Sequence, residues 1–364
     1  MTADLLYSDV EESLRSSVRD LLAARLSSHD VARSYDEAVD FRPLWRSLSS
    51  GLGLSGLLVP EVLGGAGATA REAAVVLEEL GRSVAPVPFL TSSVVATTCL
   101  LAAGEEATVS RMAAGEVVTV LALPLDSDSS SWSSEVVARD GVLRGSVRNV
   151  ADAGWADHLL LPAVGPDGEL SLFLVEARDV RVDSVVSLDM SRAVADIAID
   201  GAPGRPIVSG RDAIAAVDRA LDAGAALLAS EQLGVARWCF ETTTAYLKER
   251  RQFGRLIGSY QAVKHRMADV FLEVGHMAAV ARYAADCLAT SSDDLPVAIA
   301  VAEAYCSDVA VHVAEEAVQL HGGLGMTWEH PAHLYLKRAK ADQIAFGVPG
   351  RHRARLAELV DLPA

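Results

Sequence analysis

Helical hydrophobic spacing occupies both ends of this chain and is interrupted by one block of short β-branched runs. Near the start, Leu14, Val18 and Leu22 share one helical face. From residue 117 to about 206 the apolar runs have strand length and are separated by turn residues. This order predicts an α+β chain with three parts: an N-terminal helical domain (residues 1–116), a middle β domain (117–209) and a C-terminal helical bundle (210–364).

The middle block contains strand and turn signals. Asp140–Gly141 predicts a hairpin, and Pro166–Gly168 predicts a second turn. In the helical part that follows, Gly224 and Gly234 would destabilise a helix, so they indicate close helix packing. The predicted strands are Val117–Leu123, Glu135–Arg139, Val142–Val147, His158–Ala163, Leu170–Glu176 and Val194–Ile199.

Charge and composition exclude several function classes. The chain has 364 residues, is 51% hydrophobic and carries a formal net charge of −17. Enough apolar surface is present to offset the entropy of folding. The negative charge argues against binding to nucleic acid or to anionic membranes, because the average field repels both. We therefore predict a folded protein with no nucleic-acid partner.

Localisation is predicted from what the sequence lacks. We find no apolar run of about 20 residues, so we predict no membrane insertion, and residues 1–18 do not read as a signal peptide. The cysteines form no CxxC pair and lie in apolar contexts, which is typical of reduced core residues. These features predict a cytoplasmic protein; the cysteines are Cys99, Cys239, Cys287 and Cys306.

The first candidate site is a basic turn between two long C-terminal helices. Arg250, Gln252 and Phe253 lie in the turn, and Gln261 stands where the next helix begins. A guanidinium fork beside an amide suits a pyrophosphate, and an aromatic side chain can cover a ring. The alternative is an ordinary turn with solvated arginine side chains, which composition alone favours.

The second candidate site is a glycine-rich segment further along the chain. Gln319 and His321 precede Gly322, Gly323 and Gly325. Closely spaced glycines let backbone amides approach a ligand. The alternative is a plain helix C-cap.

We predict no metal site. His265, His312 and His321 have no ligand spacing to other donors. His330 and His333 lie three residues apart without carboxylate or cysteine partners, so we assign them a surface role.

Together, in this order, the two segments resemble the acyl-CoA dehydrogenase family, and the resemblance covers nearly the whole chain. It implies that family's α+β fold and a tetrameric flavoprotein that contains FAD. In such enzymes a carboxylate removes the α-proton of an acyl-CoA thioester, and the β-hydrogen leaves as hydride to the flavin. An electron-transferring flavoprotein then reoxidises the flavin. The residues that carry the resemblance are Val59–Glu61, Leu77–Gly81, Arg250–Gly254, Ile257–Gly258, Gln261 and Gln319–Gly325.

The resemblance also implies roles for single residues. In the family these two segments reach the ADP half of FAD bound in the neighbouring subunit. Arg250 and Gln252 would hold the pyrophosphate, and Phe253 and Gln261 would line the cofactor. The adenosine side would be held by Gln319 and the backbone of Gly322 and Gly323.

The catalytic base of the family has no counterpart here. Phe346 occupies the position of the commonest catalytic glutamate, and Gly224 occupies the alternative position. Asp222 lies about 200° around a helix from Gly224, and Glu231 about 10 Å along it, so we rank both below ordinary polar or packing roles. We therefore predict no catalytic residue in this chain.

The β domain also departs from the family. Leu121–Asp126 replaces the Thr-Glu-Pro segment that faces the flavin ring, and Asn149–Ala151 replaces a Trp-x-Thr segment. The chain keeps the segments that would contact FAD bound in a neighbouring subunit. It lacks the base and the ring-contacting segments that would serve FAD bound in its own subunit. The hypothesis is the base-less partner in a heteromeric α2β2 enzyme, with FAD at the interface to a homologous catalytic subunit. Actinobacterial enzymes acting on steroid side-chain thioesters have this asymmetry.

Two alternatives stay open at this point. The first is a self-sufficient homotetrameric dehydrogenase that uses an unusual base such as Glu231. The second is a non-enzymatic binding or scaffold protein derived from the family, with neither flavin nor turnover.

Overall fold

The computed structural model describes residues 5–362, and its N-terminal part is helical. Two helices begin at capping boxes, formed by Ser8 with Glu11 and by Thr69 with Glu72. The N-terminal helices are α1 (Asp9–Arg25), α2 (Ser28–Arg33), α3 (Arg42–Arg46), α4 (Ala70–Arg82), α5 (Thr97–Ala102) and α6 (Glu106–Ala113).

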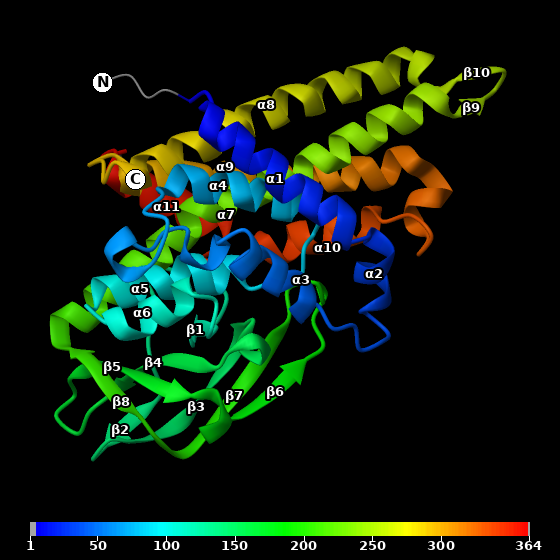
Figure 1. Ribbon diagram of the computed structural model, residues 1–364. Coiled ribbons are helices and arrows are strands. Elements are labelled where there is room, and N and C mark those ends of the chain that lie inside the picture. Colours follow the sequence, from blue (N-terminus) through cyan, green and yellow to red (C-terminus); the bar gives the residue numbers. More distant parts are fainter. Residues whose placement is uncertain (1–4, 363–364) are drawn as a thin grey trace.

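The middle of the chain forms a mixed sheet of eight strands below the helices (Figure 1). The strands are β1 (Thr119–Leu121), β2 (Val137–Arg139), β3 (Val142–Ala151), β4 (His158–Val164), β5 (Leu170–Glu176), β6 (Arg181–Val185), β7 (Val194–Pro203) and β8 (Arg205–Ser209). Their order is β6-β7-β3-β2-β4-β5-β8, with β1 parallel to β4.

Both predicted turns join antiparallel strands. Asp140 and Gly141 have φ of 52° and 74° between β2 and β3, as a tight hairpin turn requires. Gly168, with φ of 82°, closes the turn between β4 and β5. We did not predict β6 or β8. Both are edge strands with exposed polar residues, and pairing with β7 and β5 rather than propensity makes them strands.

The C-terminal part is a bundle of long helices. In Figure 1, α7 and α8 run side by side and project at one end, where β9 and β10 form a small hairpin. The helices confirm the predicted α+β architecture, in which helices precede and follow a β domain. These elements are α7 (Gly210–Glu249), β9 (Arg251–Gln252), β10 (Arg255–Leu256), α8 (Gln261–Ala289), α9 (Leu295–His321), α10 (Ala332–Asp342) and α11 (Pro349–Leu359).

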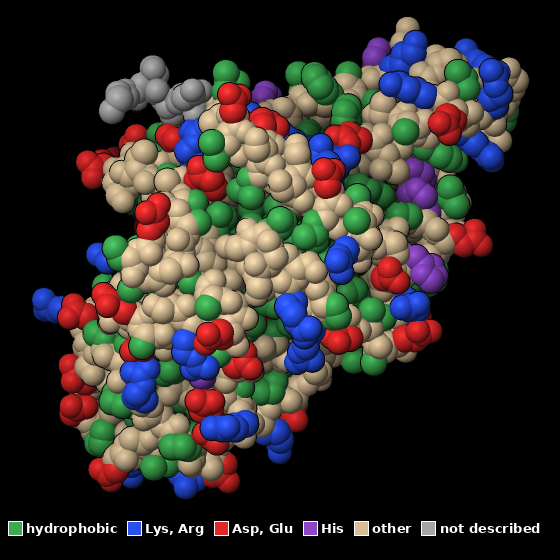
Figure 2. Space-filling model, in the orientation of Figure 1, with side chains coloured by type: hydrophobic (Ala, Val, Ile, Leu, Met, Phe, Trp, Pro, Cys, Tyr) green, Lys and Arg blue, Asp and Glu red, His purple; other side chains and the backbone are tan. Residues whose placement is uncertain are grey.

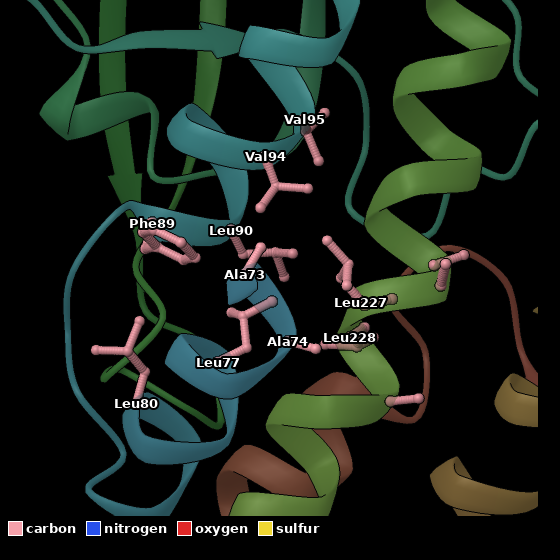
Figure 3. Packing of buried hydrophobic residues seen from close by; sticks show 14 of the residues in the cluster. Ala73, Ala74, Leu77, Leu80, Phe89, Leu90, Val94, Val95, Leu227 and Leu228 are labelled. Carbon is pink, nitrogen blue, oxygen red and sulfur yellow. The ribbon is translucent and has the colours of Figure 1, made fainter. Parts of the chain in front are cut away.

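Glycines allow α4 and α7 to cross at very short range. A Cβ on Gly234 would lie 2.0 Å from the carbonyl oxygen of Glu78, and a Cβ on Gly81 would lie 2.1 Å from that of Glu231. The predicted close packing at Gly234 is confirmed. Beyond the glycines, apolar side chains of α4, including Leu77, point toward the α7 leucines (Figure 3).

We expect Gly234→Ala to destabilise the protein by about 1–3 kcal/mol or more, because the new methyl group would overlap backbone atoms. Urea unfolding measures this. Gly350→Ala is the matched control, since a Cβ at Gly350 meets open space, and its effect should stay within about 1 kcal/mol. Equal effects of the two substitutions would contradict the packing argument.

Within residues 5–362, one helix passes the length and composition test for a membrane span. The segment Leu295–Met326, which contains α9, has 32 residues, and its most apolar 18-residue stretch has a mean hydropathy of 1.5. Our prediction that no segment is long and apolar enough was therefore wrong. The helix packs against α7, α8, α10 and α11, and 67% of its most apolar stretch is buried. Its apolar character is explained by its place in the core.

Candidate cofactor and active-site region

The two candidate segments meet at the projecting end of the helical bundle. The Tyr246 ring stacks on the His321 ring at 4.5 Å, which joins the end of α7 to the end of α9. Arg266 of α8 pairs with Glu316 of α9 at 2.5 Å. Arg250 follows Tyr246 by about one helical turn, so the turn and the glycine-rich segment lie near each other.

The predicted cofactor residues point outward. Arg250, Gln252 and Gln261 are exposed, and Phe253 is 91% exposed on a backbone with φ of 50°. Gln319, Gly322 and Gly323 are exposed too. These residues form no enclosed cavity within the described part of the chain. Their exposure leaves these residues free to contact another molecule.

This end of an acidic protein is basic. Figure 2 shows Lys and Arg side chains gathered there, at the upper right. Residues 248–264, which we call the basic tip, contain one carboxylate, Glu249, against several cations. Exposed arginines beside an exposed amide and backbone glycines suit an anionic ligand. The cations are Lys248, Arg250, Arg251, Arg255 and Lys264.

The two family positions for a catalytic base face each other and hold no proton acceptor. Phe346 is 6% exposed. A Cβ on Gly224 would lie 2.6 Å from two Phe346 ring carbons and 3.0 Å from Cγ2 of Val95. The close packing predicted at Gly224 is therefore confirmed, and the benzyl ring is what packs there.

The cavity beside Phe346 is very small. Its volume is about 30 Å³, and its lining is almost entirely apolar, with Leu121, Leu123, Ala151 and Leu221 among the residues. Ligand pockets measure roughly 300–1,000 Å³, and one water occupies about 30 Å³. Neither an isoalloxazine ring nor a thioester fits this cavity.

Backbone hydrogen bonds hold this region closed. The Phe346 amide donates to the Leu125 carbonyl at 2.9 Å, and the Leu125 amide donates to the Asn149 carbonyl at 3.0 Å. Asn149 and Phe346 both have left-handed backbones, with φ of 54° and 52°. The segments that would surround a flavin ring are therefore bonded to one another.

A buried carboxylate follows the Leu121–Asp126 segment. Asp128 accepts hydrogen bonds from Arg351 at 2.5 Å and from Ser131 at 3.0 Å. Burial raises the pKa of Asp128, but the bonds from Arg351 and Ser130 outweigh it and lower the pKa to about 2. Asp128 is therefore ionised and paired with the Arg351 cation, which fixes this loop to α11.

Glu231 is held in a buried ion-pair network. It accepts a hydrogen bond from Arg192 at 2.6 Å and another from Arg338. Burial raises the pKa of Glu231, but the two arginines outweigh burial, and the pKa is lowered. Burial and the charge of Glu231 raise the pKa of Asp342 to about 8. A carboxylate that is paired with two arginines and has a lowered pKa is a poor proton acceptor. This agrees with the polar or packing role that we predicted for Glu231.

Asp222 lies against the loop of Asp128. It accepts a hydrogen bond from Ser129 at 2.6 Å, and Arg355 lies 3.8 Å away. Burial raises the pKa of Asp222. These contacts give Asp222 a polar packing role.

Asp152 is a buried carboxylate that the sequence analysis did not single out. It accepts a hydrogen bond from Thr91 at 2.8 Å, and Thr91 lines the cavity beside Phe346. Burial raises the pKa of Asp152 to about 6, although Arg192 opposes the shift. That pKa suits a general base, but the cavity has no room for a substrate. The one sequence signal for Asp152 was its position directly after Asn149–Ala151, the segment that replaces the family's Trp-x-Thr.

The surface role predicted for His330 and His333 is wrong. Both rings are partly buried, and the His330 ring lies 4.1 Å from that of His321. Burial, together with nearby charges, lowers the pKa of each to about 4.

Because His330 and His333 are partly buried, we expect the folded protein to lose stability at acid pH. The folded state favours their neutral form, so the stability they contribute is present above pH 6.5 and is lost as the pH falls from 6.5 toward about 4. Thermal unfolding across this range measures the loss. The double variant His330→Gln/His333→Gln should show a flatter profile, and an unchanged profile would contradict the assignment.

Comparisons with known proteins agree on one family. Models of the acyl-CoA dehydrogenase N-terminal and C-terminal domains match residues 8–116 and 214–360. Acyl-CoA dehydrogenase IpdE2 of Mycolicibacterium smegmatis is 33% identical over 96% of this chain and 98% of its own. Acyl-CoA dehydrogenase FadE34 of Mycobacterium tuberculosis is also 33% identical, over 93% of this chain but only 45% of its own.

Two solved structures contain chains with a similar sequence and fold. The ChsE4-ChsE5 complex from Mycobacterium tuberculosis contains a chain with 28% identity and a TM-score of 0.86, covering 100% of both chains. A variant of the Tcur3481-Tcur3483 steroid ACAD contains one with 29% identity and a TM-score of 0.84, covering 97% of this chain and 98% of that one.

Proposed function

Because the chain belongs to the acyl-CoA dehydrogenase family, we propose that it is the subunit without a catalytic base in a heteromeric, FAD-dependent acyl-CoA dehydrogenase. Its companion would be a homologous chain that carries the base, in an α2β2 assembly. The reaction would be the α,β-desaturation of an acyl-CoA thioester, with an electron-transferring flavoprotein as electron acceptor. The similarity to a steroid enzyme and to the ChsE4-ChsE5 complex supports a steroid side-chain thioester as substrate.

The observation that carries this proposal is the small size of the cavity beside Phe346. Phe346 packs on Gly224, and the cavity beside them, of about 30 Å³, admits neither flavin ring nor substrate. Glu231, the base suggested for a self-sufficient enzyme, is paired with Arg192 and Arg338. These contacts support a reaction in a site whose flavin ring and base belong to another chain.

The basic tip would complete that site. FAD, when bound there, accepts the β-hydrogen of the thioester as hydride. Arg250 and Gln252 would hold the pyrophosphate through charge-assisted hydrogen bonds. Phe253 would cover the cofactor, and Gln319 and the backbone of Gly322–Gly323 would hold the adenosine side. The exposure of these residues in this chain is what such a role requires.

Flavin content after co-expression with a base-bearing homologue tests the proposal. We expect no flavin in this chain alone and one FAD per pair of unlike chains. Arg250→Ala should weaken FAD binding by the complex about 10- to 100-fold, because a charge-assisted hydrogen bond contributes about 1.5–3 kcal/mol. Absorbance titration of the deflavinated complex measures this affinity.

Arg251→Ala is the matched control, since it removes an equal charge from the same hairpin. A complex that binds FAD equally well with both substitutions would contradict the role of Arg250. A complex with no flavin and no turnover would support the scaffold alternative. Flavin bound stoichiometrically by the chain alone would support the homotetramer.

A further inference from the structure

The exposed glycines of the glycine-rich segment have no side chains that could hold them in place. Gly322 and Gly323 are exposed, and a Cβ on either would meet nothing within 4 Å. Gly322 has φ of 62° and ψ of −138°, a combination that residues with side chains rarely adopt. Glycine loses more conformational freedom on folding than any other residue. An ordered geometry at these two positions must therefore be imposed by neighbouring residues.

Two buried residues hold this exposed turn from either side. His321, directly before Gly322, is 3% exposed, and its Nδ1 donates to the Ala317 carbonyl oxygen at 2.7 Å. Gly325 is buried as well. A Cβ on Gly325 would lie 2.5 Å from the Val318 carbonyl oxygen and 3.0 Å from Cβ of His321. The turn is therefore folded back onto the end of α9, and His321 is its inner anchor.

Tyr246 holds His321 from the neighbouring helix α7. The two rings lie 4.5 Å apart, and their planes differ by 29°. The Tyr246 hydroxyl donates to the His321 carbonyl oxygen at 3.5 Å, at the peptide that leads into Gly322. The His330 ring also lies 4.1 Å from the His321 ring. Tyr246 thus contacts both the side chain and the backbone of the residue that precedes the glycines.

We propose that Tyr246 and His321 are positioning residues, which hold the backbone of Gly322 and Gly323 in the geometry that binds the adenosine side of the cofactor. The ligand rests on the proposed function, whereas the contact between the two rings does not. Tyr246 lies four residues, about one helical turn, before Arg250. The contact therefore fixes the glycines relative to the arginine assigned to the pyrophosphate. A turn that is ordered before its ligand arrives binds more tightly, because less freedom is lost on binding.

The other described contact at this end of the bundle is a weaker constraint. Arg266 of α8 pairs with Glu316 of α9, but the arginine side chain is 45% exposed. Exposed ion pairs contribute little, because water and salt screen them. A partly buried aromatic pair contributes more. Loss of the Tyr246 ring should therefore release the turn even though the ion pair remains.

Hydrogen exchange of the full-length chain tests the positioning without any flavin. Tyr246→Leu removes the ring and keeps a good helix former. The amides of Gly322 and Thr327 are hydrogen-bonded within the turn, and we expect them to exchange at least about fivefold faster in this variant. Tyr246→Phe is the matched control, because it keeps the ring contact, and its exchange should stay within about twofold of the wild type. Equal exchange in the two variants would overturn the proposal.

FAD affinity of the deflavinated complex with the base-bearing homologue is the second measurement. Tyr246→Leu should weaken FAD binding about 3- to 10-fold, and Tyr246→Phe should stay within about twofold of the wild type. His321→Gln removes the ring on the other side of the contact. Its effect and that of Tyr246→Leu should not add, because either substitution breaks the same contact.

Arg250→Ala distinguishes positioning from a merely structural role. Its effect on FAD affinity should add to that of Tyr246→Leu, because Arg250 would bind the cofactor through its own side chain. If Tyr246→Leu only loosened the end of α7, its effect would be coupled to Arg250 rather than to His321, and that result would overturn the proposal.

The failure of this proposal and the failure of the proposed function give different results. Faster exchange in Tyr246→Leu with unchanged FAD affinity would show that the ring contact orders the turn but does not position the cofactor. A wild-type complex that binds no FAD would instead refute the proposed function.

Discussion

Purified without a companion, this chain is expected to desaturate no acyl-CoA thioester at a measurable rate. A positioned general base contributes about 10²–10⁴-fold to such a reaction, and Phe346 and Gly224 supply none. The loss should exceed that factor, because the cavity beside Phe346 also excludes the flavin ring and the thioester. Anaerobic mixing of the chain and added FAD with acyl-CoA substrates, with FAD absorbance as the signal, measures the rate.

Restoring the carboxylate should not restore the reaction. Phe346→Glu would place an acid in an apolar cavity closed by the bonds through Leu125, where burial favours its neutral form. We expect it to remain inactive when expressed alone. Phe346→Leu is the control in the co-expressed complex, where activity should stay at the wild-type level. Reduction of flavin by the unaccompanied chain would show that it carries its own base.

Local patterns predicted most of the fold. The Asp140–Gly141 hairpin was predictable because its turn needs residues that accept positive φ, and the close packing at Gly234 because only glycine leaves room for a neighbouring backbone. Strands β6 and β8 carried no such signal, because pairing partners define edge strands. The apolar composition of α9 suited two environments, and only the packing of the whole bundle distinguished a core helix from a membrane span.

The candidate site was predicted only in part, because some of its features depend on contacts between residues far apart in the sequence. The sequence placed a benzyl group at the base position, but it did not show that Phe346, Leu125 and Asn149 are hydrogen-bonded to one another. Nor did it indicate the surroundings of Glu231. The paired arginines lie 39 and 107 residues away along the chain. Charge pairs at such separations leave no periodic pattern, so their effect on a pKa follows only from the fold.

Removal of Arg338 is expected to have the largest effect on stability. Its guanidinium donates to Asp189 at 2.6 Å, to Ser191 at 2.8 Å and to Glu231, and every one of these groups is buried. Arg338→Met keeps a long side chain but leaves buried carboxylates short of a partner. Breaking a buried ion pair in this way costs about 3–5 kcal/mol, a large share of the roughly 5–15 kcal/mol that stabilises a typical domain.

The network also joins parts of the chain that are far apart in sequence. Asp189 precedes β7 and accepts a hydrogen bond from Tyr35 of the N-terminal part at 3.1 Å, while Glu231 lies on α7. Urea unfolding of Arg338→Met should therefore lower the midpoint for helices and sheet together. Arg181→Met is the control, because Arg181 and Asp183 form an exposed ion pair, which typically contributes at most about 1 kcal/mol. If the two variants lose equal stability, the buried arginine does not hold the three parts together, and apolar packing alone must do so.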